Sequence, residues 1–291
     1  MEDKPAFPPN VALLASIVAI STASILIRMS GAPPLAIATY RLAFATLILL
    51  PFYIRSGGHK RLAVSSPRDV LTLAAVGVVL AIHFDSWITS LGLTSVASSV
   101  LFVHVDPIFV AVVSHFYLKE RIGRGTLVGI TLAFLGAVTI VFSDAGVSSV
   151  SLLGDFLALI GAIMLGLYIL AGRRLRQSLD LVSYVTPVYA FSAVTLVLAS
   201  FVSGTSLWPY PRGELLLFLV IALVPMIFGH TVYNWTLKWL SAPLVSISLL
   251  GEPVGATILA YLLLDEVPSI LTLFGGMLIL LGIYQCVRSS R

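Results

Sequence analysis

Ten apolar runs, each bounded by proline, glycine or charged residues, fill most of the sequence and limit what it can fold into. They cover residues 11–29, 34–54, 69–91, 95–117, 125–143, 152–171, 181–202, 214–237, 242–264 and 268–287. A helix of about 20 apolar residues crosses the hydrocarbon core of a bilayer. Such a run must be helical there, because an open segment satisfies its backbone hydrogen bonds in no other way. The sequence therefore predicts an all-α membrane protein with ten transmembrane helices.

The composition supports this interpretation. Of the 291 residues, 58% are hydrophobic and 10% are charged, and the mean hydropathy is +1.05, whereas about a quarter of a soluble domain is charged. The single cysteine, Cys286, can form neither a disulfide framework nor a cysteine-based zinc site. The net charge of +4 comes from Lys and Arg residues that lie mostly at the ends of the runs. These residues orient the chain in the membrane, and we expect no nucleic-acid partner.

The Lys and Arg residues concentrate in alternate connections between the runs. With the N-terminus inside, 14 of the 17 fall on the cytoplasmic side: Lys4, Arg55, Lys60, Arg61, Arg68, Lys119, Arg121, Arg124, Arg173, Arg174, Arg176, Lys238, Arg288 and Arg291. Arg28 and Arg212 fall outside, and Arg41 lies within a run. Cytoplasmic loops carry an excess of Lys and Arg. We therefore expect a multi-pass protein of the cell membrane with both termini in the cytoplasm.

Two segments, 87–142 and 233–288, repeat one pattern at a constant spacing of 146 residues. The matching positions are Asp106-Pro107 and Glu252-Pro253, Glu120 and Glu266, Gly129 and Gly275, and Gly136 and Gly282. The pattern predicts two repeats, residues 11–143 and 152–288. With five spans each, an odd number, the repeats must lie antiparallel in the membrane. Inverted repeats with an interrupted helix at corresponding positions are typical of secondary transporters, which bind substrate near the membrane midplane.

Several short motifs, taken in order, resemble one transporter family. They are Tyr40-Arg41-Leu42, the runs 94–100, 106–109 and 118–121, and, in the second half, Leu250-Gly251-Glu252-Pro253 followed by Asp265-Glu266. Over nearly its whole length the chain resembles the EamA-type family of the drug/metabolite transporter superfamily. The resemblance implies ten helices in two inverted five-helix repeats. It also implies export of amino acids, nucleobases or other small metabolites, and sometimes of toxic organic compounds. The chain departs from the family at Asp85 and Asp106, where acids replace the usual residues.

Two acids precede prolines near the centres of the fourth and ninth runs. A proline inside a helix removes one backbone donor and bends the helix, so Asp106 and Glu252 each lie beside a bend. A static kink with an acid bonded to a neighbouring helix fits this pattern, and so does a hinge that lines a cavity. Because the feature occurs twice at inverted positions, we favour the cavity. Asp106 and Glu252 are then candidate substrate- or proton-binding residues, and Pro107 and Pro253 are candidate hinges.

Arg41 lies within the second run and keeps its charge. A charge at the centre of a membrane helix costs roughly 2.5–3.5 kcal/mol, so Arg41 needs a counter-charge or an anionic ligand. Asp85 and Asp106 are the expected partners. A structural ion pair and a site for a substrate carboxylate remain equally open. A buried carboxyl left unpaired favours its protonated form, which makes protons a candidate coupling ion.

Two His-x-Asp patterns, His83-x-Asp85 and His104-x-Asp106, lie on neighbouring antiparallel runs. Imidazole and carboxylate are good metal ligands. Residues two apart on a helix, however, point roughly 200° apart, so one helix cannot readily present both groups to one ion, and we expect no metal site. Hydrogen bonds between helices, and a pocket or proton-relay role, remain open for these residues and for His230.

Trp87 and Tyr233 occupy equivalent positions in the two repeats. Aromatic residues near helix ends commonly anchor a protein at the membrane interface. An aromatic cavity wall, which would hold organic cations or apolar groups by cation–π contact and stacking, is the alternative. Glycines seven residues apart, Gly129 with Gly136 and Gly275 with Gly282, predict close packing between helices.

The sequence thus predicts a secondary active transporter that exports small organic metabolites, such as amino acids, by alternating access. The candidate substrate-binding residues are Arg41, His83, Asp85, Trp87, Asp106, Tyr233 and Glu252. The sequence has no G-x-x-x-x-G-K-[ST] phosphate-binding loop, so we expect substrate or ion gradients, rather than bound ATP, to supply the energy, and no cofactor. A non-selective channel and an intramembrane enzyme using His and Asp are the alternatives. Because the sequence lacks a G-x-S-G element and recognisable surroundings for catalytic acids, we do not expect an enzyme.

Overall fold

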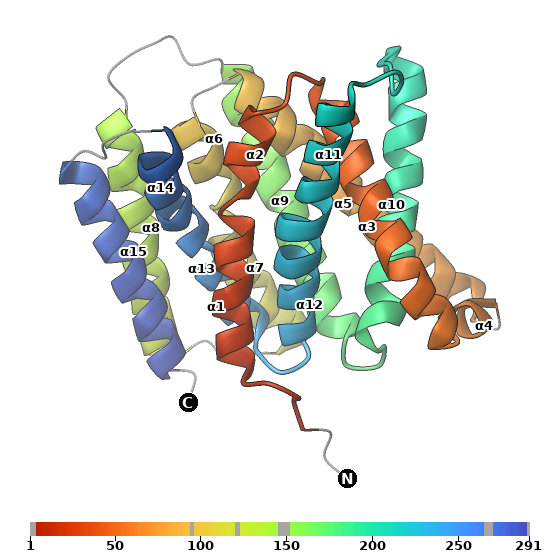
Figure 1. Ribbon diagram of the computed structural model, residues 1–291. Coiled ribbons are helices and arrows are strands. Elements are labelled where there is room, and N and C mark those ends of the chain that lie inside the picture. The colour runs from red at the N-terminus through yellow and green to blue at the C-terminus, as the bar shows by residue number, and fades with distance from the viewer. Residues whose placement is uncertain are drawn as a thin grey trace.

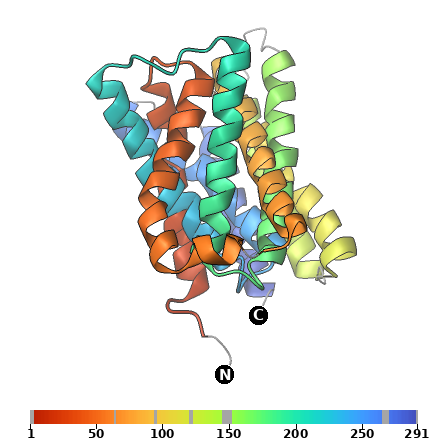
Figure 2. The ribbon, with the colours of Figure 1, turned by 90° about the vertical axis from the view of Figure 1, so that its right-hand side faces the viewer.

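The computed structural model describes residues 4–63, 65–93, 96–119, 123–144, 152–264 and 270–289. Every regular element in these ranges is a helix (Figure 1). The elements are α1 (Pro9–Ile20), α2 (Ala23–Arg28), α3 (Pro34–Arg55), α4 (Gly58–Ala63), α5 (Pro67–Leu93), α6 (Val96–Val103), α7 (Asp106–Val113), η1 (Ser114–Leu118), α8 (Arg124–Asp144), α9 (Leu152–Leu175), α10 (Leu181–Ser203), α11 (Arg212–Ile221), η2 (Ala222–Thr231), α12 (Val232–Thr236), α13 (Ala242–Leu249), α14 (Gly251–Leu264) and α15 (Ile270–Ser289). The longer helices run between the two ends of one bundle (Figure 2).

Seven helices in the described ranges are long and apolar enough to cross a membrane, by length and composition. They span Pro9–Arg28, Pro34–Arg55, Pro67–Leu93, Phe156–Leu175, Leu181–Ser203, Arg212–Thr236 and Ala242–Leu263. Shorter apolar helices cover Phe109–Leu118, Arg124–Gly136 and Leu273–Cys286. The described residues therefore agree with the predicted all-helical, multi-pass membrane protein.

Two of the predicted spans are interrupted at the acid–proline pairs. The span 95–117 divides into α6 and α7 at residues 104–105, and the span 242–264 divides into α13 and α14 at Leu250. Pro107 lies in the first turn of α7 and Pro253 in the first turn of α14. A proline cannot donate a backbone hydrogen bond to the preceding turn, so each helix restarts next to it. The breaks bring His104 and Glu252 to the starts of new helical segments.

The eighth predicted span is not a regular α-helix. Its middle, η2, is a ten-residue π-helix that contains Pro225 and His230. Stretches of π-helix are rare and frequently occur at functional sites. The first predicted span also divides, into α1 and α2, at Ser21 and Thr22. The hydroxyl groups of both residues donate to carbonyl oxygens of α1.

The chain between the second and third predicted spans is partly helical. It contains the short helix α4, which begins directly after Gly57. Gly57 has a φ of 73°, a backbone conformation that glycine adopts with little strain and that commonly ends helices. It ends α3 and allows the chain to turn directly into α4.

Helices α8 and α15 pack along the predicted glycine faces. A Cβ atom added to Gly136 would lie 2.4 Å from the carbonyl oxygen of Gly275, and one added to Gly129 would lie 2.4 Å from Sγ of Cys286. Gly282 meets the backbone of Gly129 in the same way. Small residues allow membrane helices to approach closely and gain van der Waals contact. The predicted packing role of these glycines is confirmed.

The bundle is apolar both inside and outside. Its centre holds large buried aromatic residues, including Phe84, Tyr168, Tyr189 and Phe218. On the outer surface Val202, for example, is 90% exposed to the surroundings. Because lipid tails are as apolar as these side chains, apolar burial alone does not drive membrane helices together, and packing and polar contacts do so instead.

Candidate functional site

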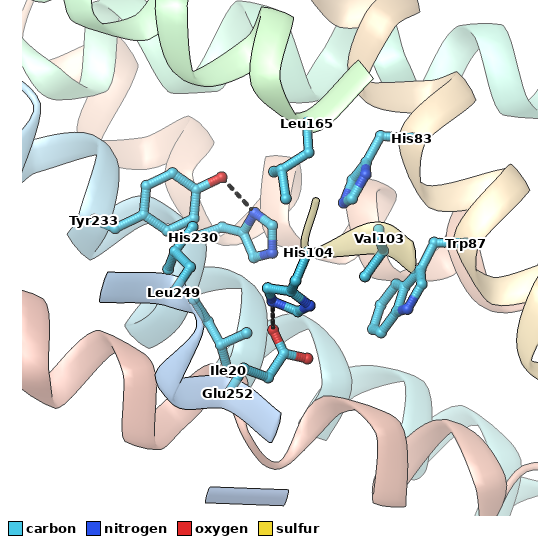
Figure 3. A pocket seen from close by; sticks show the side chains of 10 residues that line it. All are labelled: Ile20, His83, Trp87, Val103, His104, Leu165, His230, Tyr233, Leu249 and Glu252. Atoms are coloured by element: carbon cyan, nitrogen blue, oxygen red, sulfur yellow. Dashed lines mark hydrogen bonds and ion pairs between the residues drawn. The ribbon is translucent and has the colours of Figure 1, made fainter. Parts of the chain in front are cut away.

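A narrow cavity lies between the two interrupted helices and their neighbours. It is lined by Ile20, His83, Trp87, Val103, His104, Leu165, His230, Tyr233, Leu249 and Glu252 (Figure 3). Its volume is about 20 Å³, which is room for about one water molecule. Three histidine rings from three different elements turn toward this space, together with one carboxylate.

The contact between His104 and Glu252 joins the two breaks. His104 Nδ1 lies 2.7 Å from the carbonyl oxygen of Val100. A carbonyl only accepts, so Nδ1 carries a hydrogen and donates it. The other ring nitrogen, Nε2, lies 3.4 Å from Glu252 Oε2. A neutral imidazole would present a bare acceptor to the carboxylate, so an attractive contact needs one more proton, on His104 or on Glu252. With that further proton the pair would carry no net charge.

Asp106 makes a second contact between the interrupted helices. The Ser246 hydroxyl in α13 donates to Asp106 Oδ2, while Oδ1 has no hydrogen-bond partner among the described residues. Asp106 is almost completely buried, yet it does not line the cavity. His104 and Asp106, two residues apart, thus face different parts of the α13–α14 span, in agreement with the divergence expected for an i, i+2 pair.

The remaining cavity wall is mostly aromatic. His83 Nδ1 lies 2.9 Å from the carbonyl oxygen of Gly161, which fixes the ring orientation. The Trp87 ring lies parallel to His83, with ring centroids 6.2 Å apart. Across the cavity, the Tyr233 hydroxyl lies 2.9 Å from His230 Nδ1. The cavity therefore presents aromatic faces together with ring nitrogens held by hydrogen bonds.

Arg41 is completely buried, with 0% of its surface exposed. Its Cζ atom lies 4.2 Å from the centroid of the Phe84 ring. The expected ion pair with Asp85 or Asp106 does not form, and none of the three guanidinium nitrogens has a hydrogen-bond partner in the part of the chain that the structure describes. Asp106 instead accepts a hydrogen bond from Ser246 in α13.

The structure brings together four of the seven predicted substrate-binding residues, His83, Trp87, Tyr233 and Glu252, in the cavity wall. The other three, Arg41, Asp85 and Asp106, are not among the lining residues. Asp85 is half-buried and has no hydrogen bond or ion pair to any described residue. Glu120 and Glu266, the other repeated acids, lie outside the described residues.

Some lining residues were not among the predicted substrate-binding set. His104 and His230 stood out in the sequence only as polar residues inside apolar runs, and the His104-x-Asp106 pattern drew attention to its acid instead. Ile20, Leu165 and Leu249 carry no signal that separates them from other apolar residues of their helices. Within the described ranges, no group of three or more His, Cys, Asp or Glu residues is arranged to hold a metal ion.

Comparison with known proteins places the chain among transporters. The sequence profile of the EamA-like transporter family matches residues 10–142 and again residues 152–288. The chain belongs to the EamA-like transporter family. It is therefore a membrane protein of the drug/metabolite transporter superfamily, and the resemblance stated from its motifs is confirmed.

Relatives of this EamA protein carry transporter names. An uncharacterised transporter of Archaeoglobus fulgidus is 28% identical over 88% of this chain and 89% of its own length. The pseudopaline exporter CntI of Pseudomonas aeruginosa is 26% identical over 97% of this chain and 95% of its own length. A solved crystal structure superposes with a TM-score of 0.78 at 18% identity, covering 97% of this chain and 96% of that one, which shows the fold. Family and relatives point to a transporter rather than an enzyme.

Proposed function

We propose that this EamA protein is a secondary active transporter that exports small organic metabolites, such as amino acids, across the cell membrane by alternating access. The observation that carries the proposal is the meeting of two interrupted helices through buried polar contacts, His104 with Glu252 and Asp106 with Ser246. Transporters of this kind bind substrates and coupling ions at interrupted helices near the midplane. A purely structural membrane protein has no need for paired acids beside paired helix breaks.

The proposed architecture has ten transmembrane helices in two inverted five-helix repeats, residues 11–143 and 152–288. It is supported by helices in each of the ten predicted runs and by the two separate matches to the family profile. The start of α1 and the end of α15 lie at the same end of the bundle (Figure 1), as an even number of spans requires. The distribution of Lys and Arg places that end in the cytoplasm.

The size of the cavity and the helix breaks beside it support the proposal of alternating access. A cavity of about 20 Å³ is too small for an amino acid, so the substrate-bound state must be wider. The helical segments after Pro107 and Pro253 are the hinges that we propose, because each begins where the hydrogen-bond ladder of its span is interrupted. Movement of α14, which carries Glu252, changes the contact with His104, and movement of α7, which carries Asp106, changes the contact with Ser246. Opening is thereby tied to a change in buried polar contacts.

Protons are the coupling ions that we propose. The His104–Glu252 pair holds one proton between two almost fully buried side chains. When the helices move apart, each group is exposed separately and the shared proton can leave. Uptake from one side of the membrane and release on the other would couple export to a proton gradient.

The proposed direction of transport draws on one relative. CntI is named an exporter of pseudopaline, so a protein similar to this chain over nearly its full length exports an organic compound. We extend export, though not that substrate, to this chain. Its mixed wall of aromatic rings, ring nitrogens and one carboxylate suits small molecules that carry both polar and apolar groups.

Efflux from proteoliposomes tests the proposal. Vesicles containing the purified protein are loaded with a labelled amino acid mixture, and efflux is followed with and without a pH gradient. We expect saturable efflux that is faster with the gradient and is lost in Asp106→Asn. The matched control is Asp69→Asn, because Asp69 is exposed and hydrogen-bonds Ser66 at the start of α5, far from the cavity. Protein-free vesicles give the background leak.

The alternatives give different results. Efflux that rises in proportion to concentration without saturating indicates a channel and contradicts the proposal. Chemical conversion of the labelled compounds indicates an intramembrane enzyme. If no amino acid moves, the amino acid part of the proposal is wrong, and the same assay with nucleobases and organic cations decides whether the protein transports other metabolites.

A further inference from the structure

Arg41 is a buried cation that has no counter-ion among the described residues. Its guanidinium group carries five N–H donors, and none of its nitrogens has a described hydrogen-bond partner. The Phe84 ring below it provides a cation–π contact but accepts no conventional hydrogen bond. A fully buried charge in a membrane protein is normally paired or serves a ligand or ion pathway. The part of the chain that the structure describes offers Arg41 no such pair.

The acids near the bundle centre are engaged with other groups. Glu252 acts electrostatically on the Arg41 charge, but its carboxyl group faces His104. The Glu252 carboxyl group thus pairs with His104 and forms no ion pair with Arg41. Asp106 accepts its hydrogen bond from Ser246 and forms no ion pair with Arg41. Arg41 therefore has no ion-pair partner among the described residues at the centre of the bundle.

Arg41 is one aromatic layer away from the cavity. The Phe84 ring that covers it lies 4.8 Å from the His83 ring and 5.1 Å from the His230 ring, measured between centroids. His83 and His230 both line the cavity. Widening of the cavity to admit a substrate would have to displace these rings, which brings the guanidinium within reach of a bound molecule.

We propose that Arg41 binds the carboxylate group of the transported substrate, so that the substrates are small carboxylates, amino acids included. A carboxylate has one negative charge and accepts two parallel hydrogen bonds from a guanidinium, which matches the single charge and the unfilled donors of Arg41. A phosphate group carries a charge of about −1.5 to −2 at neutral pH, which is more than the single charge of Arg41 balances. An organic cation would face Arg41 itself. The inference rests on the proposed transport function and deepens it by naming the substrate class.

The first test is binding, measured without transport. The detergent-purified protein is heated with each of the protein amino acids and a set of simple mono- and dicarboxylic acids. Each chosen carboxylate is compared with its amide and its decarboxylated amine, for example leucine with leucinamide and isoamylamine, and inorganic phosphate is a separate arm. We expect carboxylates to raise the melting temperature of the wild type and the amides and amines to leave it unchanged. We expect Arg41→Met to weaken carboxylate binding about tenfold or more.

The matched control is Arg28→Met, because Arg28 is exposed at the end of α2; it should respond to carboxylates as the wild type does. Without ligand, Arg41→Met should melt at the same temperature as the wild type or higher, since it removes an unpaired buried charge. Arg41→Lys keeps the charge and should retain part of the binding. A lower melting temperature in Arg41→Met, with no response of the wild type to any carboxylate, marks Arg41 as structural and overturns the inference. An equal response to amides, or a response to phosphate alone, also overturns it.

Transport of the same panel separates this inference from the proposed function. If compounds without a carboxylate leave the vesicles at equal rates in the wild type and in Arg41→Met, the protein is a transporter but Arg41 is not a carboxylate site. Carboxylate stabilisation that depends on Arg41, without efflux of any compound, supports the site and rejects transport.

Discussion

His104 Nε2 lies 3.4 Å from Glu252 Oε2, and this contact joins the breaks of two membrane helices that are far apart in the sequence. The Nδ1 hydrogen of His104 is committed to the carbonyl oxygen of Val100, so the contact is attractive only when the pair holds a further proton. A pH-sensitive group is thus placed at the position where the two proposed hinges meet. Any movement that opens the cavity between these helices must change its environment.

Replacing Glu252 with Gln should uncouple transport from the proton gradient. The amide group that replaces the carboxyl group cannot take up or release a proton, so we expect efflux at one rate whether or not a pH gradient is present. Efflux from proteoliposomes at several gradients measures this. Glu214→Gln is the control, because Glu214 accepts hydrogen bonds from Ser30 and Gly31 at the end of the bundle and should remain coupled. A Glu252→Gln protein that still follows the gradient would place the proton site elsewhere.

Replacing Ser246 with Ala should destabilise the protein by leaving the Asp106 carboxyl group without a described donor. The loss of a hydrogen bond to a buried polar group costs about 1–3 kcal/mol. The melting temperature in detergent should fall in Ser246→Ala and recover in part in Ser246→Ala/Asp106→Asn, because the double variant lacks the unpartnered acid. Ser200→Ala is the matched buried control, since its hydroxyl group donates within its own helix. Equal effects of Ser246→Ala and Ser200→Ala would show that the contact between the spans contributes little.

Replacing Gly136 with Leu should separate α8 from α15. A Cβ atom at this position would lie 2.4 Å from the carbonyl oxygen of Gly275, so the helices must move apart, and overpacking of this kind typically costs about 1–3 kcal/mol. Cys286 reports on the separation, because it is the single cysteine and is 1% exposed between the two helices. We expect slow maleimide labelling in the wild type and fast labelling in Gly136→Leu. Gly213→Leu, at a position with open space, should label slowly; fast labelling of the wild type would contradict the close packing.

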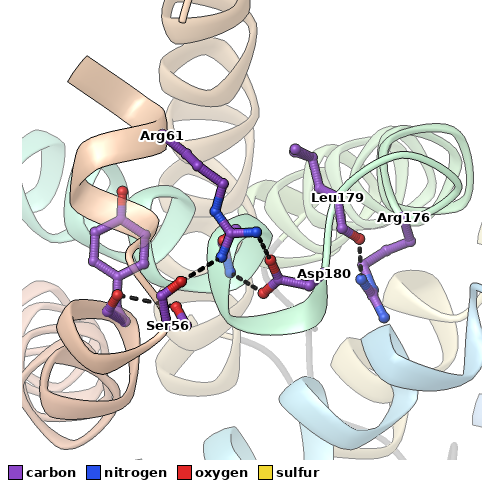
Figure 4. Close-up of polar contacts among 7 residues, drawn as sticks. Ser56, Arg61, Arg176, Leu179 and Asp180 are labelled. Carbon is purple, nitrogen blue, oxygen red and sulfur yellow. Dashed lines mark hydrogen bonds and ion pairs between the residues drawn. The ribbon is translucent and has the colours of Figure 1, made fainter. Parts of the chain in front are cut away.

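The ion pair between Arg61 and Asp180 should make the stability of the protein depend on pH. Asp180 caps α10 by accepting a hydrogen bond from the Ser183 amide at 3.0 Å, and it lies 3.0 Å from Arg61 (Figure 4). Burial raises the pKa of the Asp180 carboxyl, but the hydrogen bond from the Ser183 amide and the charges of Arg61 and Arg176 outweigh it, so the pKa lies below its usual value. A lowered pKa stabilises the folded protein above the unfolded value of about 3.9, and this contribution is lost as the pH falls through the lowered pKa.

Asp180→Asn tests this dependence, because Asn caps helices as well as Asp does but carries no charge. At neutral pH the variant should melt slightly below the wild type, by the equivalent of at most about 1 kcal/mol for a partly exposed pair. The difference should vanish in strong acid, where both side chains are neutral. A constant difference between neutral pH and strong acid would show that the charge of Asp180 contributes nothing to stability.

The features predicted from the sequence are those that depend on residues close together in the chain. In a bilayer, a run of about 20 apolar residues can satisfy its backbone hydrogen bonds only as a helix. Glycines seven residues apart lie on one face of such a helix. The prolines after Asp106 and Glu252 mark the places where the two helices break, because proline lacks a backbone donor. His83, Trp87, Tyr233 and Glu252 line the cavity, and their role in substrate binding stays a prediction.

The sequence by itself therefore determined the helical class of this protein, the approximate spans and the positions of their breaks. The tertiary structure decided which groups meet: His104 rather than Asp106 faces Glu252, Ser246 donates to Asp106, and Arg41 lies on Phe84 instead of in the expected ion pair. The physical reason is that a membrane helix is apolar on nearly all sides, so its sequence carries little information on its rotation. That rotation is set by packing against neighbouring helices, through contacts between residues that can be more than a hundred positions apart.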